Sequence, residues 1–506
     1  MSVPTRPVDP HDRLWLERVR PPDWVNPPPA KRYNLVVVGG GTAGLVCAAG
    51  AAGLGARVAL VESGLLGGDC LNTGCVPSKA LLSSARMAAE RQAARGSVDG
   101  SRVPRGDPAD FGAAMERMRR IRAEIAAHDS AARFRDLGVD VFFGAARFIA
   151  RDTVEVEGSR LRFARAVIAT GARPTVPGIP GLSEAGYLTS ESVFDLTALP
   201  PRLAVVGGGP IGCELAQAFA RFGSGVVVLE REERLLPSED PDVGDAIRSA
   251  LSADGVELAL GAMLVEVERT PSGSRLAIDE PAGRRSVEVD AILIAAGRSP
   301  NVAGLDLDAA GIELDGRGRI RADDRLRTTN RRVYVAGDVV GGRQFTHLAD
   351  AHARIVLRNA LFHGRAKADA LRVPECTFTD PEVARVGHTL ASASAAGVGA
   401  RAFVQPFDTV DRPRIEGEER GFARVLVEER SDTIVGATIV GRHAGELIAL
   451  VALAIESDVG LADLASIVWP YPTRAQVLGA VANQYQRSRL TPRNRRILAR
   501  WMAWRR

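Results

Sequence analysis

Two stretches of the chain repeat one order of apolar and polar positions. The first, YNLVVVGGGTAGLVCAAGAAGLGARVALVES, begins at Tyr33 with an apolar run, passes through a glycine-rich turn and a segment of small residues, and returns to an apolar run ending at Glu62. The second, RLAVVGGGPIGCELAQAFARFGSGVVVLER, has the same order and ends its second apolar run at Glu230. Short apolar runs bounded by glycine predict buried strands, and the segment between them predicts a helix. The pattern therefore predicts two strand-helix-strand units.

The turn of each unit carries the glycine spacing typical of dinucleotide binding. The glycines are Gly39, Gly41 and Gly44 in the first unit and Gly207, Gly209 and Gly212 in the second. They permit a tight turn, close approach of a pyrophosphate and close packing of helix on strand, and the helix N-terminus faces the negative charge. Glu62 and Glu230 follow their first glycine at the same interval, where a carboxylate accepts hydrogen bonds from a ribose diol. We therefore expect two bound nucleotides.

The remaining patterns extend this fold. The segments VIATGARPTVPG (167–178) and ILIAAGRSPN (292–301) each run from an apolar strand into a glycine-containing turn, and we expect them to cross between two nucleotide domains. In VYVAGDVVGG (333–342), Asp338 follows a strand at a place where a carboxylate can bond a ribityl chain. From Pro374 onward, alternating segments precede the helical pattern AGELIALVALAIES, which predicts a third, α+β unit.

Length and composition narrow the class of protein. A chain of 506 residues suggests two to four domains. The formal net charge is only +4, and the 65 basic residues are scattered and offset by 61 acidic ones, so no nucleic-acid partner is indicated. The N-terminus lacks a signal-peptide pattern, and no window reaches about 18 consecutive apolar residues. We therefore expect a soluble, cytoplasmic protein.

The segment GGDCLNTGCVPSKALL (67–82) holds two of the five cysteines, Cys70 and Cys75. In a reducing compartment a nearby cysteine pair is more often catalytic or metal-binding than structural. Lys79, four positions after Cys75, is one of three lysines beside 62 arginines. A lysine kept in such a chain indicates that this position requires a compact ammonium group.

These motifs together resemble the FAD-dependent pyridine nucleotide-disulfide oxidoreductases, the family of dihydrolipoamide dehydrogenase, glutathione reductase and mercuric reductase. The resemblance covers about residues 33–487, and its most specific part is GGDCLNTGCVPSK. The local sequence of these motifs is most similar to that of the mercuric reductase-like group. The resemblance implies an α/β fold with two Rossmann-like dinucleotide-binding domains, for FAD and NAD(P), and a C-terminal α+β domain that forms a homodimer.

The resemblance also implies domain boundaries and cofactor contacts. The expected domains are an N-terminal extension (1–30), an FAD-binding domain (31–175 and 300–373), an NAD(P)-binding domain (176–299), a dimerisation domain (374–486) and a basic C-terminal tail (487–506). The residues expected to contact FAD or the nicotinamide nucleotide are Gly39, Gly41, Thr42, Ala43, Gly44, Glu62, Ser63, Gly68, Lys79, Thr170, Gly171, Gly207, Gly209, Pro210, Ile211, Gly212, Glu230, Gly297, Arg298, Gly337 and Asp338.

The resemblance assigns different roles to the two cysteines. It implies that Cys75 faces the flavin and that Cys70 exchanges with substrate. The segment VPSKALL predicts a helix start with Pro77 in its first turn, which places the positive end of the helix dipole beside Cys75 and favours its thiolate. The family pattern also pairs Lys79 with Glu214 near the reactive nitrogen of the flavin.

The choice of nicotinamide nucleotide depends on Glu230. A carboxylate at the strand tip accepts hydrogen bonds from a free 2′-hydroxyl and repels a 2′-phosphate, which favours NADH. Arg231 and Arg234 follow closely and can accommodate that phosphate, so NADPH stays possible.

The chain departs from the disulfide-reducing members at one place. Their partner subunit supplies a His-Pro-Thr-x-x-Glu segment as the acid-base pair, whereas this chain has WPYPTRAQ, with Tyr471 and Gln476 at the two positions. A phenol with an ordinary pKa of about 10 is a poor proton shuttle near neutrality. The resemblance implies that mercuric reductase also has a tyrosine at this position. Mercuric reductase carries a vicinal cysteine pair near its C-terminus, and this chain has no such pair, because its last cysteine is Cys376.

The remaining cysteines, two histidines and the C-terminal tail are not assigned to the catalytic machinery. We expect Cys47, Cys213 and Cys376 to be small core residues, and His347 and His352 to pack or cap helices rather than act in catalysis. No metal ligands are assigned. The tail after residue 486 holds eight arginines interleaved with apolar residues, among them Trp501 and Trp504. It predicts a terminal helix that packs on the dimer, or alternatively one that lies on an anionic membrane surface.

The predicted function is NAD(P)H-dependent electron transfer through FAD and a Cys70–Cys75 disulfide to an acceptor. Mercuric or another soft metal ion is the leading acceptor class. A dihydrolipoamide dehydrogenase-like or other disulfide reductase is the alternative within the enzymes. From another class, the chain is alternatively a redox-sensing or electron-transfer flavoprotein with a protein partner.

Overall fold

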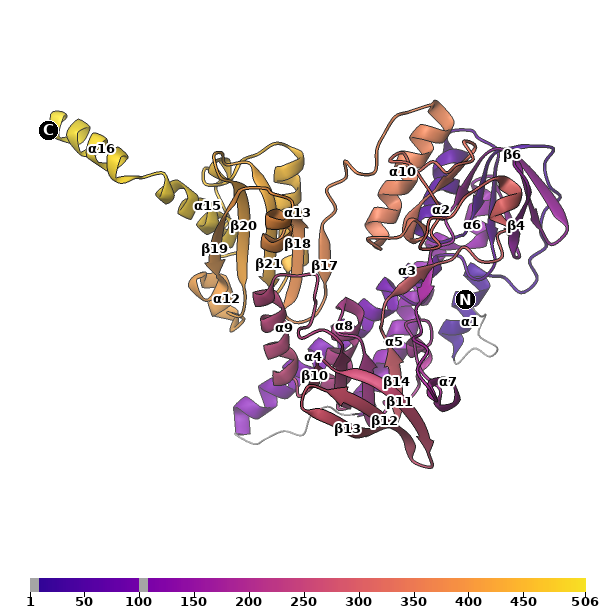
Figure 1. Cartoon of the computed structure of the whole chain (residues 1–506), viewed down its shortest axis with the longest axis horizontal. Coiled ribbons are helices and arrows are strands. Elements are labelled where there is room, and N and C mark those ends of the chain that lie inside the picture. The colour runs from indigo at the N-terminus through magenta and orange to yellow at the C-terminus, as the bar shows by residue number, and fades with distance from the viewer. Residues whose placement is uncertain (1–8, 100–107) are drawn as a thin grey trace. The chain divides into compact units, whose positions relative to one another are not determined.

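The computed structural model describes residues 9–99 and 108–506, drawn in Figure 1. The chain forms two compact units. The first consists of 1–207, 218–229 and 263–371, and the second of 208–217, 230–262 and 372–506. Because α8 (Pro210–Phe222) runs through both units, the boundary cuts the second predicted strand-helix-strand unit. The division into three domains expected from the sequence stays a prediction.

The first strand-helix-strand unit forms as predicted, from β1 (Tyr33–Val38), α2 (Thr42–Gly53) and β2 (Val58–Glu62). It belongs to a 7-stranded sheet in the order β3-β2-β1-β6-β5-β4, with β16 also paired to β6. Both β1 and β2 are buried along nearly their whole length, as expected for parallel strands covered on both faces. Helices α2 and α10 (Thr346–Phe362) lie side by side next to this sheet (Figure 1).

The other elements of the first unit are as follows. The remaining strands of the large sheet are β3 (Val139–Phe143), β4 (Ala146–Ala150), β5 (Thr153–Val156), β6 (Ser159–Ile168) and β16 (Val333–Val335). The helices are α1 (Pro10–Val19), α3 (Gly68–Asn72), α4 (Cys75–Asp99), α5 (Pro108–Ile125), α6 (Ala131–Asp136) and α7 (Leu182–Ala185). A separate 3-stranded antiparallel sheet consists of β11 (Met263–Thr270), β12 (Gly273–Glu280) and β13 (Gly283–Val289).

The second strand-helix-strand unit also has the predicted strands. β8 (Arg202–Val206) pairs in parallel with β9 (Gly225–Glu230) on one side and with β14 (Ala291–Ile294) on the other. The two predicted crossing segments meet each other, because β7 (Ala172–Pro174) pairs antiparallel with β15 (Arg298–Pro300). The glycine-arginine turns of the sequence are therefore parts of one two-stranded ribbon.

The C-terminal part of the second unit is the predicted α+β arrangement. Its 5-stranded sheet has the order β17-β18-β21-β20-β19, and α13 (Ala444–Glu456) packs on β18 and β21. The strands are β17 (Glu375–Thr377), β18 (Glu382–Gly387), β19 (Ala400–Pro406), β20 (Phe422–Glu428) and β21 (Ile434–Gly441). The other elements are α9 (Pro241–Ala253), β10 (Glu257–Leu260), α11 (Leu390–Ala395), α12 (Asp411–Glu416), α14 (Leu461–Leu464), α15 (Gln476–Ser488) and α16 (Pro492–Trp504).

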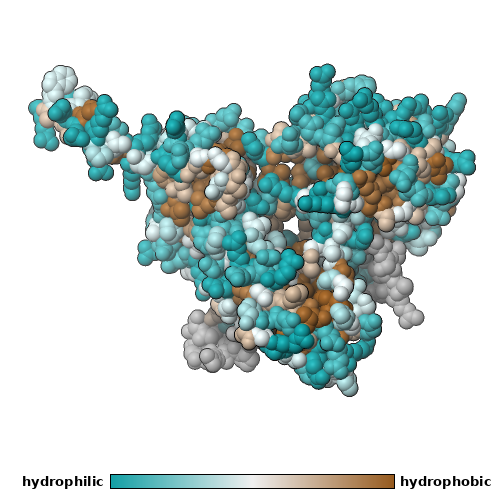
Figure 2. Space-filling model, viewed as in Figure 1, coloured by the Kyte–Doolittle hydropathy of each residue, from teal (hydrophilic) through white to brown (hydrophobic). Residues whose placement is uncertain are grey.

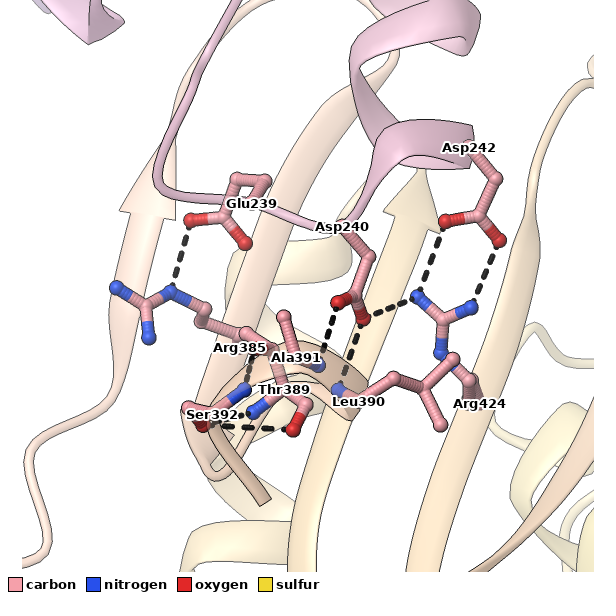
Figure 3. Close-up of polar contacts among 9 residues, drawn as sticks. All are labelled: Glu239, Asp240, Asp242, Arg385, Thr389, Leu390, Ala391, Ser392 and Arg424. Carbon is pink, nitrogen blue, oxygen red and sulfur yellow. Dashed lines mark hydrogen bonds and ion pairs between the residues drawn. The ribbon is translucent and has the colours of Figure 1, made fainter. Parts of the chain in front are cut away.

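A buried polar network joins the loop before α9 to the C-terminal sheet (Figure 3). Asp240 accepts hydrogen bonds from the backbone N–H groups of Leu390 and Ala391 at the start of α11, both at 3.1 Å. The guanidinium of Arg424 on β20 pairs with Asp240 at 2.9 Å and with Asp242 at 2.7 Å. Because a buried charge without its partner is costly, these contacts fix the loop that follows Glu230 against the sheet.

The basic tail forms α16, as the sequence predicted, and none of its residues is buried. Figure 2 shows its apolar side chains at the surface among hydrophilic ones, and Trp504 is 81% exposed. Within residues 9–99 and 108–506, no helix is long and apolar enough to cross a membrane.

Candidate active site

The first glycine-rich turn is shaped by contacts that exclude side chains. Gly39 has φ +108°, and a Cβ there would lie 2.3 Å from the carbonyl oxygen of Ala169, beside the predicted site residues Thr170 and Gly171. A Cβ on Gly44 would lie 1.8 Å from the carbonyl oxygen of Gly39. The turn therefore passes directly over the end of β6, and glycine is required for both steric and conformational reasons.

A cradle suited to a dinucleotide surrounds the start of α2. Gly41 is the N-cap of α2 and provides no side-chain hydrogen bond, so the first backbone N–H groups of the helix, including those of Thr42 and Ala43, lack intrahelical acceptors. A Cβ on Gly68 would lie 2.6 Å from the α-carbon of Gly41, and one on Gly337 would lie 3.2 Å from the Cβ of Ala43. These residues fit the pyrophosphate of FAD, because bare backbone and a helix N-terminus face the same place.

Glu62, predicted to contact a ribose, also stabilises the turn. Its carboxylate accepts hydrogen bonds from the backbone N–H of Gly40 and of Gly64, both at 2.6 Å. Burial raises the pKa of Glu62, and these two bonds oppose that rise. Each carboxylate oxygen keeps a second lone pair, so Glu62 can hold the turn and still accept from a diol next to Ser63.

The second strand-helix-strand motif repeats this arrangement around Glu230. The Gly208 N–H donates to one carboxylate oxygen at 2.6 Å, and the Glu232 N–H donates to the other at 2.8 Å. Gly207 has φ +116°, and a Cβ there would lie 2.5 Å from the carbonyl oxygen of Ala295. The turn continues through Gly209 into Pro210, Ile211 and Gly212 at the start of α8. The repeated sequence therefore produces repeated geometry.

Arg298 joins three segments near the cysteine pair. Its guanidinium pairs with Asp69, lies 3.9 Å from the carboxylate of Asp338, and donates to the carbonyl oxygen of Ala172 at 2.9 Å. Burial, opposed by Arg298, raises the pKa of Asp338 to about 6. Asp338 follows Gly337, and Arg298 follows Gly297, which has φ +109°. These two predicted cofactor residues therefore lie in one charge cluster.

Both redox candidates are thiols in this structure. Cys75 is the first residue of α4 and Pro77 lies in its first turn, which confirms the predicted helix start. The Sγ of Cys75 is exposed and lies 3.2 Å from Thr346 Oγ1 at the start of α10. Hydrogen bonding with Cys75, together with burial, raises the pKa of Cys70.

Lys79 lies one turn after Cys75 on α4 and is partly exposed, so the two side chains share a helix face. Glu214 belongs to the second unit, where it is buried and accepts a hydrogen bond from the Phe378 backbone N–H at 2.8 Å. The proposed pairing of Lys79 with Glu214 joins the two units and stays a prediction.

Tyr471 projects from the C-terminal part and is 70% exposed. Its hydroxyl donates to the carboxylate of Asp411 at 3.1 Å, and this bond raises the pKa of Tyr471. Gln476 begins α15. The phenol is therefore less acidic than an ordinary tyrosine, which strengthens the contrast with a His–Glu pair.

The sequence analysis missed several residues of this site. Gly40 and Gly208, the middle residues of the two turns, supply the N–H groups that hold the acids, while Asp69 and Thr346 contact Arg298 and Cys75. The repeated Gly-Gly-Gly triplet was the signal for the first two. Within residues 9–99 and 108–506, no group of three or more His, Cys, Asp and Glu is arranged to hold a metal ion.

Relatives of known identity align over most of the chain. A mercuric reductase of Bacillus cereus is 35% identical over 446 residues, which is 88% of this chain and 70% of the relative. A dihydrolipoyl dehydrogenase of Chlamydia muridarum is 33% identical over 88% of this chain and 95% of its own. Among solved structures, a Cu(II) complex of the HOCl-induced flavoprotein disulfide reductase RclA from Escherichia coli matches with a TM-score of 0.78 at 29% identity, covering 90% of this chain and 100% of that one.

Two family descriptions match the sequence itself. Residues 33–353 match the pyridine nucleotide-disulphide oxidoreductase family, and residues 373–482 match the dimerisation domain of the same family. The predicted fold class and the expected use of FAD and NAD(P)H are thereby confirmed. With its two glycine-turn sites, its thiol pair and these matches, the chain belongs to the pyridine nucleotide-disulphide oxidoreductase family of flavin-dependent enzymes.

Proposed function

We propose that this enzyme is mercuric reductase-like: a homodimer that uses NAD(P)H to reduce a soft metal ion bound as substrate by Cys70 and Cys75. The residues that would hold FAD are the cradle of Gly41, Gly68 and Gly337, together with Glu62 at the ribose position. When bound, FAD supplies a two-electron acceptor and donor between the nicotinamide and the thiol pair.

The electrons of the proposed reaction balance without another reactant. One NAD(P)H gives up a hydride, which carries two electrons and a proton. A mercuric ion takes both electrons and becomes elemental mercury, and the proton is released to solvent. The protein residues therefore need to hold the ion and keep thiolates available, and they need not protonate a sulfur leaving group.

The observation that carries this proposal is the thiol pair together with Tyr471 and Gln476 at the two positions where the resemblance expects a His–Glu pair. Two adjacent thiols, one exposed and one partly exposed, are the soft ligands that such ions prefer. Tyr471, hydrogen-bonded to Asp411, is a poor proton donor. The mercuric reductase name of one relative and the Cu(II) ligand of the RclA structure support the same acceptor class.

The second candidate is reduction of an organic disulfide, favoured by the dihydrolipoyl dehydrogenase relative and by the RclA description as a disulfide reductase. An anaerobic acceptor screen separates the two. Enzyme reduced with NADH should reduce mercuric or cupric ion at least about 10²-fold faster than lipoamide or oxidised glutathione. Disulfide reduction without a positioned acid-base group is expected to be slower by at least that factor. Faster oxidation by lipoamide would establish the second candidate, and oxidation by none of these acceptors would favour a protein partner.

Nucleotide choice gives a separate prediction. The wild-type enzyme should have a higher kcat/KM for NADH than for NADPH with a dye acceptor, because the Glu230 carboxylate repels a 2′-phosphate. Glu230→Ala should narrow the difference about tenfold, the value of roughly one hydrogen bond to a charged group. Arg231, whose side chain is 79% exposed and paired with Glu232, provides the control. If Arg231→Ala lowers kcat/KM for NADPH alone, the arginine reads the phosphate and the assignment to Glu230 is wrong.

The match to the dimerisation domain supports the homodimer, in which Tyr471 would act on the thiol pair of the other subunit. Membrane contact through α16 stays a prediction that the relatives do not support. The exposed apolar face of α16 and the eight arginines of the tail are what favour it.

A further inference from the structure

The N-terminal extension, to which the sequence analysis assigned no role, packs against the loop between the two thiols. Helix α1 begins after Asp9, whose carboxylate caps it by accepting from the N–H groups of His11 and Asp12. Trp15 is 3% exposed, and its indole Nε1 donates to Asn72 Oδ1 at 2.8 Å. Asn72 is the last residue of α3 and lies between Cys70 and Cys75.

Asn72 is held from several sides. Its side-chain amide donates to the carbonyl oxygens of Leu65 and Leu66 at 3.4 and 3.1 Å. Its own carbonyl oxygen accepts from Arg122 Nη1 at 3.1 Å, which satisfies a backbone group at the end of a helix. Since Asn72 is fully buried, every one of these polar groups would be costly to leave without a partner.

Arg122 connects this residue back to α1. Its guanidinium lies over the Trp15 ring, 3.8 Å from the centroid, and pairs with Asp12 at 2.7 Å. The side chains of Arg122 and Asp12 are 3% and 7% exposed. A charge kept at such a depth is retained only with its partners in place, so Trp15, Asp12 and Arg122 constrain the position of Asn72 together.

We propose that Trp15 and Asp12, which we call the α1 brace, are positioning residues for the Cys70–Cys75 pair. Through Asn72 and Arg122 the brace holds the connecting loop so that the two sulfur atoms stay within bonding reach. A disulfide forms when both thiols are oxidised, releasing two protons and two electrons, and its stability rises with the effective concentration of one thiol at the other. This inference rests on the proposed redox role of the pair.

The test is the thiol-disulfide equilibrium of the full-length holoenzyme in dithiothreitol redox buffers, with Cys70 and Cys75 quantified by alkylation and mass spectrometry. Trp15→Phe keeps the ring but removes the donor to Asn72. It should lower the equilibrium constant for disulfide formation about tenfold, which for a two-electron couple is about 30 mV. Asp12→Asn, which removes the charge partner of Arg122, should change it in the same direction.

The matched control is Trp24→Phe, the same chemical change on the same N-terminal segment. Trp24 Nε1 donates to the Val141 carbonyl oxygen at 3.2 Å, and Val141 belongs to β3 rather than to the segment between the two cysteines. Equal shifts in Trp15→Phe and Trp24→Phe, or no shift in Trp15→Phe and Asp12→Asn, would overturn the brace while leaving the proposed function intact. A wild-type enzyme that forms no Cys70–Cys75 disulfide at any buffer ratio would overturn the proposed redox role, and the brace with it.

Discussion

Replacing Cys75 by serine is expected to lower NADH-driven reduction of a soft metal ion by at least on the order of 10⁴-fold, the scale found when one member of a cooperating catalytic unit is removed. Cys75 is the exposed first residue of α4, where the helix dipole favours a thiolate. A serine hydroxyl is neither anionic near neutrality nor a soft ligand. The measurement is steady-state turnover with mercuric ion and, in parallel, with a general dye acceptor, which takes electrons without the thiols and should be unaffected.

The same variants assign the roles of the two cysteines. With FAD bound, Cys70→Ser leaves Cys75 as a permanent free thiol and should show a long-wavelength thiolate-to-flavin absorption band without reduction. Cys75→Ser should lack that band. Cys376→Ser is the control, because Cys376 lies on β17 outside the proposed machinery and its loss should leave turnover unchanged. The band appearing in Cys75→Ser instead would reverse the assignment.

Restoring the acid-base pair is expected to create disulfide reductase activity. Tyr471→His with Gln476→Glu should raise lipoamide turnover roughly 10²- to 10⁴-fold, the usual contribution of a positioned acid-base group to a proton transfer. Reduction of a metal ion should change little, because no sulfur leaving group is protonated. Rates of lipoamide and mercuric ion reduction by the wild type, the double variant and Tyr471→His alone check this, and the single variant should gain less because no carboxylate orients its imidazole.

Wild-type lipoamide turnover as fast as the reduction of bound flavin by NADH would contradict this reasoning and require another proton donor. His347, His352 and His443 are then the residues to replace. Burial lowers the pKa of His352 to about 4, so this histidine is neutral at pH 7.

Much of the site was predictable because its signals are local in the sequence. The strands and helices of both glycine-turn units follow from apolar periodicity, and the helix that begins at Cys75 follows from the proline in its first turn. Gly39 and Gly207 adopt a positive φ, which favours glycine. This requirement comes from the turn itself and does not depend on the rest of the fold. The thiol pair, the acids Glu62 and Glu230 at the ends of their strands, and the replacement of a His–Glu pair by Tyr471 and Gln476 could therefore all be identified from the sequence.

The contacts that complete the site join residues far apart in the chain, and periodicity carries no information about them. Arg298 and Asp69 are 229 positions apart, Thr346 and Cys75 are 271 apart, and Trp15 reaches Asn72 across 57. A helical or strand pattern states that a face is buried, but the element that covers it depends on the topology of the whole unit. The pairing of β7 with β15 and the burial of Asp12 against Arg122 arise in the same way, from segments that are distant in the sequence and meet in the folded unit.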